Sequence, residues 1–222
     1  MRIFILLLTF LNVQLAKSQN DTLIYIGDPM CSWCYGFGPE LDKIIKAFPN
    51  TPFEMIMGGL RPEGRETIGD LKEFLWNHWK EVQIRSGQKF NFSILSKKEM
   101  FYDTEPACRS VVIMRRLNHD CAYDFYKAAQ HSFFYNNIDP LEGETYARLA
   151  KDFGVDDEVF LDLFNDEQSM ADTNSDFSLA EAMGIQSFPT LIAKIDNKLY
   201  LVSNGFQKAE QLILRLKAKG LH

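Results

Sequence analysis

The sequence predicts an α/β fold in which the two ends of the chain share one sheet around a block of helices. A strand, a helix and a strand are indicated over residues 22–57, and a β-hairpin with a closing helix over 190–219. Between them, apolar residues recur at the spacing of amphipathic helices. Neither end has enough strands to be stable alone. We therefore expect two sheet-forming segments, 19–61 and 173–222, with a helical insertion at 62–172.

The first segment has the pattern of a βαβ unit. Residues 22–27 (TLIYIG) form a short β-type run, and 53–57 (FEMIM) form a second one. Between these strands, residues 31–48 carry apolar side chains at helical spacing. The unit therefore places the start of its helix at the carboxyl end of the first strand.

The middle of the chain is dominated by helical patterns. One helix is indicated by Ile68, Leu71, Leu75, Trp79 and Val82, which repeat at three- and four-residue spacing. Turn and capping residues predict the further boundaries. We expect helices from Thr104 as N-cap to Leu117, from Asp120 as cap to Phe134, from Asp139-Pro140 to Gly154, over 157–164 and over 174–183. Strands at 190–195 and 199–202 then flank Asp196-Asn197, and a helix closes the chain at 207–219.

Composition excludes several classes of protein. Apolar residues make up 46% and charged residues 24% of the 222, which is typical of a globular chain and not of a disordered one. A net charge of -6 argues against nucleic-acid binding. Four cysteines are too few for a disulfide scaffold, and a chain of this length buries its own core. The cysteines are therefore free for chemistry.

The N-terminus has the features of an export signal. Arg2 precedes a mostly apolar run at residues 3–16, and small residues follow at Ala16 and Ser18. We expect a signal peptide over 1–18, cleaved after Ser18, and a secreted or periplasmic protein. The run is too short to span a membrane, so no membrane span is expected. The alternative is a buried first strand or helix.

A pair of cysteines two residues apart carries the predicted chemistry: Cys31-Ser32-Trp33-Cys34. A cysteine in the first turn of a helix faces unpaired backbone N–H groups and the positive end of the helix dipole, which stabilise a thiolate. Such placement lowers the pKa of the thiol. We expect Cys31 to attack a disulfide and Cys34, one turn deeper, to resolve the mixed disulfide.

The sequence disfavours other roles for the cysteines. A zinc site needs a second close pair of ligands, and Cys108, Cys121, His119 and His131 do not supply that spacing. A static Cys31–Cys34 disulfide would close almost no chain and stabilise little. The predicted helix ending at Leu117 separates Cys108 from Cys121 by about 13 Å of helical rise. Disulfide Cα atoms lie within about 7 Å, so we expect two free thiols.

Residues beside the pair allow two interpretations each. Asp28 either raises the pKa of the Cys31 thiol by its charge or serves as a turn residue before Pro29. Trp33 is expected to face solvent or a cleft, where it would meet a substrate. The 18 phenylalanines indicate either an aromatic core or an apolar binding surface. The methionines at 30, 55 and 57 suit core packing better than a copper site.

Several motifs resemble the DsbA-like branch of the thioredoxin superfamily, and within it the FrnE-type proteins. The resemblance extends over about residues 22–217. It rests on five segments in order: Asp28 to Phe37 (DPMCSWCYGF), Gly58 to Pro62 (GGLRP), Ser86 to Phe90 (SGQKF), Asp103 to Arg109 (DTEPACR) and Gly184 to Thr190 (GIQSFPT).

The resemblance implies a thioredoxin fold with a large all-helical insertion domain. It also implies a cis peptide bond at Pro189, in a loop that faces the cysteine pair and binds the substrate chain. Phe188 and Pro189 inherit that role, together with Ser32 and Trp33 between the cysteines. From the residues alone, Phe188-Pro189 would be an ordinary loop-to-strand junction. Ser32-Trp33 replaces the Pro-His pair of the family's periplasmic oxidant, and Tyr25 stands where some thioredoxins have a buried acid.

We therefore expect a thiol–disulfide oxidoreductase that acts on protein substrates, with a redox partner protein and with no metal or nucleotide cofactor. Its redox direction is open. One alternative is a glutathione-dependent transferase or isomerase of the kappa-class or hydroxychromene carboxylate isomerase type, which usually lacks the second cysteine, here Cys34. The other is a non-enzymatic chaperone or peptide-binding module.

Overall fold

The structure is a computed structural model that describes residues 21–221. Within this range four strands form one sheet in the order β2–β1–β3–β4. β1 is parallel to β2 and antiparallel to β3, so both ends of the chain share one sheet as the sequence predicts. The strands are β1 (Thr22–Gly27), β2 (Phe53–Met57), β3 (Thr190–Ile195) and β4 (Lys198–Asn204).

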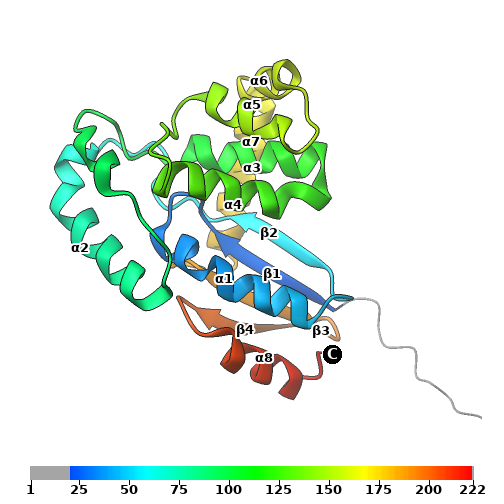
Figure 1. Ribbon diagram of the computed structural model, residues 1–222. Helices are drawn as coiled ribbons and strands as arrows, with labels where there is room; N and C mark the ends of the chain where they lie inside the picture. Colours follow the sequence, from blue (N-terminus) through cyan, green and yellow to red (C-terminus); the bar gives the residue numbers. More distant parts are fainter. Residues whose placement is uncertain (1–20, 222) are drawn as a thin grey trace, which may run out of the picture.

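Helices cover both faces of the sheet (Figure 1). On one face, α1 (Ser32–Ala47) packs against α8 (Ala209–Ala218). On the other face lies α7 (Glu167–Ala182), whose Ala180 packs against Ile26 of β1. Because side chains alternate along a strand, Tyr25 points into the main core on the α1 side.

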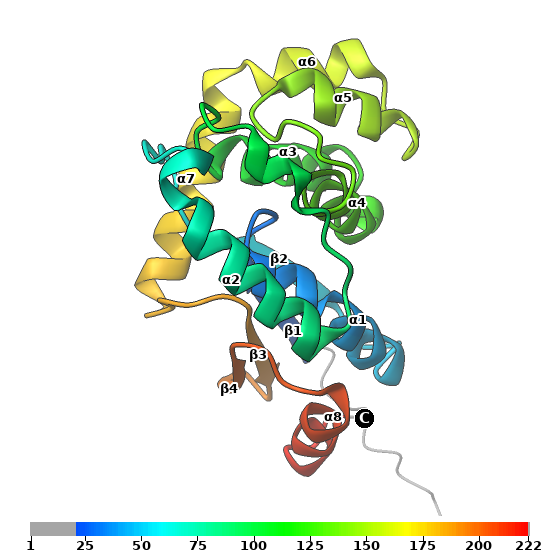
Figure 2. The same ribbon diagram turned by 60° about the vertical axis from the view of Figure 1, so that its left-hand side comes forward.

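The remaining helices lie between β2 and β3 in the chain and form a block at one end of the sheet (Figures 1 and 2). α2 runs alongside α1 and contacts it. The predicted thioredoxin fold with an all-helical insertion is confirmed. The elements of the block are α2 (Ile68–Ser86), the 3-10 turn η1 (Phe92–Ser96), α3 (Glu105–Leu117), the 3-10 turn η2 (His119–Cys121), α4 (Ala122–Phe134), α5 (Gly143–Lys151) and α6 (Asp157–Phe164).

The predicted start of α7 is wrong. The helix begins at Glu167 rather than at residue 174, so one helix crosses the boundary expected after residue 172. The buried positions of this segment include the polar residues Ser169, Thr173 and Asp176, which hide its apolar periodicity.

Capping predictions within the block also need correction. Asp120 does not cap α4, because the chain first makes the η2 turn and the helix starts at Ala122. Thr104 stands at the N-cap of α3, but its hydroxyl accepts a hydrogen bond from the Arg61 N–H instead of capping. Asp139 accepts from the Leu141 N–H in a turn, and α5 begins later.

An ion pair ties α7 to α3 and to the sheet. Asp176 pairs with both guanidinium nitrogens of Arg115, at 2.8 and 2.9 Å, and also accepts a hydrogen bond from the Met57 N–H. The same arginine donates to the Met55 carbonyl oxygen at 2.5 Å. Both side chains are mostly buried, so the pair fixes the block against β2.

Eight of the 16 phenylalanines in the described residues are buried in the core, and six more pack against it. The buried ones pack with Trp79 and with Met30, Met55 and Met57. Of the two interpretations of the phenylalanine content, an aromatic core therefore accounts for more of these residues than an apolar binding surface does. They are Phe37, Phe48, Phe90, Phe125, Phe133, Phe134, Phe160 and Phe164.

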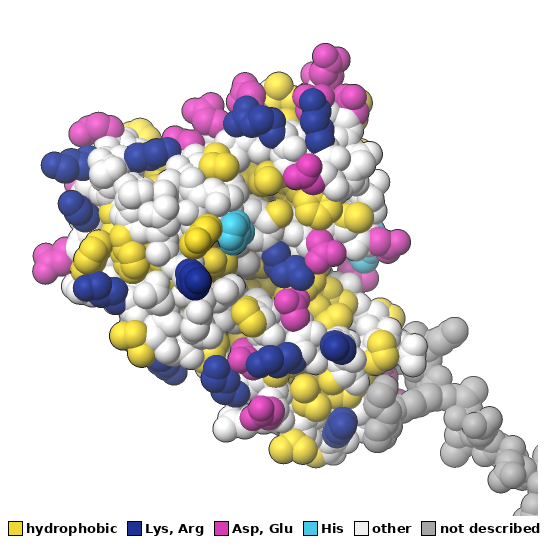
Figure 3. Space-filling view, viewed as in Figure 1, with side chains coloured by type: hydrophobic (Ala, Val, Ile, Leu, Met, Phe, Trp, Pro, Cys, Tyr) yellow, Lys and Arg dark blue, Asp and Glu magenta, His cyan; other side chains and the backbone are white. Residues whose placement is uncertain are grey.

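The surface carries charges of both signs. Figure 3 shows basic and acidic side chains intermingled on the face viewed, with acidic ones gathered at the top over α5 and α6. This agrees with the negative net charge. Among the helices of residues 21–221, none has the length and apolar character needed to cross a membrane. The predicted signal peptide lies outside the described residues.

Candidate active site

The cysteine pair lies where β1 passes into α1. Cys31 is the N-cap residue of α1 and Cys34 lies in its first turn. Both are free thiols, and both are buried, with 6% of Cys31 and none of Cys34 exposed. Cys31 is therefore the more exposed residue of the pair.

A loop from the far end of the chain faces this pair. The Phe188–Pro189 peptide bond is cis, as the resemblance implies, and it immediately precedes β3. The Cys31 thiol points to the Phe188 carbonyl oxygen, at a sulfur–oxygen distance of 3.8 Å. Gly58, just after β2, approaches the Phe188 ring so closely that a Cβ there would lie 2.1 Å from it.

Aromatic side chains surround the residues between the cysteines. The Trp33 ring contacts His78 of α2 edge-to-face and Phe206 in the loop before α8, with both pairs of ring centroids 5.8 Å apart. The Arg85 guanidinium lies 4.9 Å from the Trp33 centroid, over its face. Ser32 is buried, so Trp33 is the intervening side chain that remains partly open to a substrate.

Asp28 is an internal acid and more than a turn residue. Its carboxylate is fully buried and accepts hydrogen bonds from the N–H groups of Met30, at 2.8 Å, and Leu60, at 2.7 Å. It also accepts from the Cys108 thiol, at 3.4 Å. Burial raises the pKa of Asp28, although these donors oppose the shift.

The pKa of Cys31 departs from the expectation made for a helix N-terminus. The hydrogen bond with the Cys34 thiol and burial raise it well above its usual value, and the charge of Asp28 adds to the effect. The backbone N–H of Cys34 acts in the opposite direction. In the reduced protein, these effects on the pKa of Cys31 therefore outweigh the thiolate stabilisation expected from the helix N-terminus.

Sequence reasoning missed a cluster of tyrosines beneath the pair. The hydroxyls of Tyr25 and Tyr126 lie 3.3 Å apart, and Tyr126 donates to the Asp28 carbonyl oxygen at 3.2 Å. Tyr102 donates to the Met30 carbonyl oxygen at 2.6 Å. The one local signal for this cluster is the position of Tyr25, six residues before Cys31, where some thioredoxins have a buried acid.

The other two cysteines, Cys108 and Cys121, lie outside the Cys31–Cys34 pair. Cys108 is buried against Asp28, and Cys121 is partly exposed at the end of η2. Both are free thiols, as expected. Burial raises the pKa of Cys108 well above its usual value, and unlike Cys31 this residue has no exposed surface through which a substrate could reach it.

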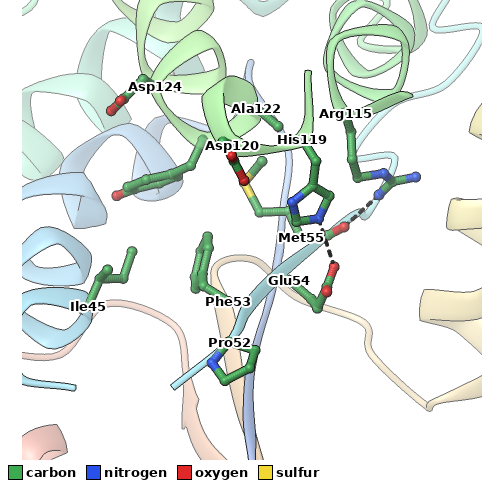
Figure 4. Close-up of a pocket in the computed structure, with 11 residues that line it drawn as sticks. Ile45, Pro52, Phe53, Glu54, Met55, Arg115, His119, Asp120, Ala122 and Asp124 are labelled. Atoms are coloured by element: carbon green, nitrogen blue, oxygen red, sulfur yellow. Dashed lines mark hydrogen bonds and ion pairs between the residues drawn. The ribbon is translucent and has the colours of Figure 1, made fainter. Parts of the chain in front are cut away.

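A separate cavity of about 380 Å³ opens between α1, β2 and α4 (Figure 4). It is lined by Phe53, Tyr123 and several charged residues, and it contains none of the predicted site residues. Its His119 lies 3.3 Å from Glu54, and its Arg115 is held by the Met55 carbonyl and Asp176. Its principal polar groups are therefore already paired.

A CxxC pair at a helix N-terminus, a cis-proline loop opposite it and a β2–β1–β3–β4 sheet together define a thioredoxin-fold protein. The model of the DSBA-like thioredoxin domain matches residues 22–217. The chain therefore belongs to the DsbA-like thioredoxin-domain family, in the thiol–disulfide oxidoreductase superfamily. None of the curated proteins compared matches it in sequence.

Solved structures share this fold. A putative protein disulfide isomerase from Nitrosomonas europaea is 30% identical with a TM-score of 0.80, over 89% of this chain and 96% of that one. The cytosolic disulfide reductase DsbM from Pseudomonas aeruginosa is 20% identical with a TM-score of 0.74, over 89% and 98%. A 2-hydroxychromene-2-carboxylate isomerase is 11% identical with a TM-score of 0.62, over 90% and 94%.

Proposed function

We propose that this protein exchanges disulfides with protein substrates through Cys31 and Cys34. The observation that carries the proposal is the position of Cys31. It is the more exposed sulfur of a CxxC pair, at the N-terminus of α1 and opposite the Phe188–Pro189 loop. In this arrangement a bound substrate chain pairs with the loop while its sulfur approaches Cys31. The family acts on protein thiols, which supports this substrate class.

The exchange takes two steps in the reducing direction. The Cys31 thiolate attacks a substrate disulfide, forming a mixed disulfide and releasing one substrate thiol. Cys34 then attacks the Cys31 sulfur, so that the Cys31–Cys34 disulfide forms and the second substrate thiol leaves with a proton. Two electrons pass from the cysteine pair to the substrate. A redox partner protein restores the dithiol, and the opposite sequence oxidises a substrate.

We propose that the Cys31–Cys34 pair has the reduction potential of a reductant rather than that of a strong oxidant. The surroundings that raise the pKa of Cys31, from the Cys34 hydrogen bond and burial to the charge of Asp28, favour the thiol over the thiolate. Strong oxidants in this superfamily instead stabilise the reduced form through its thiolate, and Ser32-Trp33 supplies no histidine to do so. The expected potential is therefore nearer about -270 mV than about -120 mV.

Cysteine substitutions test the proposal. Cys31→Ser should abolish insulin reduction, whereas Cys34→Ser should accumulate a mixed disulfide through Cys31 on a non-reducing gel. Cys121→Ser is the matched control, because this thiol is partly exposed but lies on η2 outside the pair. Unchanged turnover in Cys31→Ser would refute the proposal. A chain that suppresses aggregation with both cysteines replaced would favour the chaperone alternative.

We also propose that the protein is exported. The support is the sequence of residues 1–18, with its positive charge, apolar run and small residues before the expected cleavage site. N-terminal sequencing of the chain recovered from an exporting host should begin at Gln19. A chain that keeps residues 1–18 and stays in the cytoplasm would contradict export without touching the redox proposal.

A further inference from the structure

A buried chain of hydroxyl groups ends at the resolving cysteine. The hydroxyl of Tyr25 is hydrogen-bonded to the Cys34 side chain. It also lies 3.3 Å from the hydroxyl of Tyr126. Tyr126 reaches the Asp28 carbonyl oxygen, at 3.2 Å. Tyr25 and Tyr126 are each about 1% exposed, and their rings meet edge-to-face with centroids 5.9 Å apart. These contacts connect β1 to α4 directly beneath the cysteine pair.

We propose that Tyr25 donates a hydrogen bond to the thiolate of Cys34 during the resolving step, and that Tyr126 positions the Tyr25 hydroxyl for this role. The inference rests on the proposed disulfide exchange and assigns a function to residues that this exchange leaves unused. Tyr25 stands six residues before Cys31, where some thioredoxins have a buried acid. A neutral hydroxyl there supports the thiolate without adding a repelling charge.

Hydroxyl groups suit this task because they can turn. While Cys34 is a thiol, it donates to the Tyr25 oxygen, Tyr25 donates to Tyr126, and Tyr126 donates to the Asp28 carbonyl. When Cys34 loses its proton, the Tyr25 O–H turns to the sulfur and the Tyr126 O–H turns to the Tyr25 oxygen. Either oxygen of the tyrosine pair has the geometry to donate.

Burial keeps the hydroxyls of Tyr25 and Tyr126 protonated, so that they can donate hydrogen bonds. Burial raises the pKa of Tyr25 well above its usual value, and the nearby charge of the Cys34 sulfur adds to the effect. Burial likewise raises the pKa of Tyr126. Both phenols therefore stay protonated at neutral pH, and hydrogen bonds to ionised groups are stronger than neutral ones.

The resolving step balances with these groups in place. Cys34 loses its proton, its sulfur bonds to the Cys31 sulfur, and the bond between Cys31 and the substrate sulfur breaks. Cys34 is oxidised, and the substrate sulfur leaves with the electron pair and takes up a proton. Tyr25 is unchanged at the end, because it only donates a hydrogen bond while the thiolate exists.

A small aromatic disulfide, dithiobis(nitrobenzoate), separates the two steps. Attack by Cys31 releases one coloured nitrothiobenzoate anion, and attack by Cys34 on the resulting mixed disulfide releases the second. A Cys121→Ser background removes the partly exposed thiol outside the pair. Stopped-flow absorbance over a range of pH then gives a rate and a pH midpoint for each phase.

Tyr25→Phe should slow the second phase about 10- to 100-fold at neutral pH and move its midpoint upward, because a hydrogen bond to a charged group is lost. The first phase should keep its rate. Tyr126→Phe should produce a smaller change in the same direction. Tyr35→Phe is the control, since its partly buried hydroxyl donates to the Lys89 carbonyl oxygen rather than to Cys34.

The outcomes distinguish this inference from the function on which it rests. A second phase in Tyr25→Phe with the wild-type rate and midpoint would overturn the role of Tyr25. Equal slowing in Tyr35→Phe, or equal slowing of both phases, would show a structural effect and overturn it as well. A wild-type chain with no second phase would refute the disulfide exchange itself.

Discussion

The contact between Gly58 and Phe188 should couple the end of β2 to the cis-proline loop. An alanine at position 58 would place its Cβ 2.1 and 2.2 Å from two ring carbons of Phe188. Contacts under 3.0 Å do not occur between real Cβ atoms and their neighbours, so the ring must move by roughly 1 Å. We expect this movement to shift the Phe188 carbonyl that faces Cys31 as well.

The cost follows from two effects. Overpacking of this kind destabilises a fold by about 1–3 kcal/mol. A displacement of about 1 Å at a positioned group costs up to about 100-fold in rate. We therefore expect Gly58→Ala to lower the free energy of unfolding by about 1–3 kcal/mol and to slow the attack by Cys31.

A double-mutant cycle tests the reasoning. Urea unfolding gives the stability of Gly58→Ala, Phe188→Ala and the double variant, and stopped-flow absorbance gives the rate of the first phase. Without the Phe188 ring, Gly58→Ala should cost no more than about 0.5 kcal/mol, which is typical of a site away from such a clash. An equal cost of Gly58→Ala in both backgrounds would refute the steric explanation.

Further predictions concern the acidic residues. The pKa of Cys31 is raised by the Cys34 hydrogen bond, by burial and by the charge of Asp28. Asp28→Asn removes that charge, so the pH midpoint of the first phase should move downward. An unchanged midpoint would contradict this. Burial raises the folded-state pKa of Asp28 above its unfolded value, so its contribution to stability is complete below the unfolded pKa and is lost as the pH rises through the folded one. Unfolding measurements over this window should therefore show wild type losing stability relative to Asp28→Asn. Asp176→Ala should cost about 3–5 kcal/mol, because it leaves Arg115 and the Met57 N–H without their partner, whereas Asp172→Ala, which breaks an exposed pair with Arg116, should cost about 0–1 kcal/mol; similar costs would contradict the assigned role of Asp176.

The sequence predicted those elements whose signals are local. β1, β2 and β3 have the predicted bounds, as does α6, because short apolar runs and turn residues delimit them. The Asp196–Asn197 turn has positive φ at both residues, as its hairpin requires. α7 was misplaced because Ser169, Thr173 and Asp176 fill its buried face.

The environment of the site could not be predicted because long-range contacts create it. Tyr25 and Tyr126 lie 101 residues apart in the chain, and Asp28 and Cys108 lie 80 apart. No periodicity connects such pairs. The cysteine pair itself was predictable, since its spacing and the flanking strand and helix are local. The raised pKa of Cys31 was not, because burial and the Cys34 contact depend on the folded chain.

A redox titration of the wild-type chain tests the central claim most directly. The reduced protein is equilibrated with dithiol buffers of stepped potential, and peptide masses follow each of its four cysteines. We predict one two-electron transition, nearer about -270 mV than about -120 mV, in which the Cys31–Cys34 disulfide forms while Cys108 and Cys121 remain thiols. A titration in which this pair never forms a reversible disulfide would contradict the account.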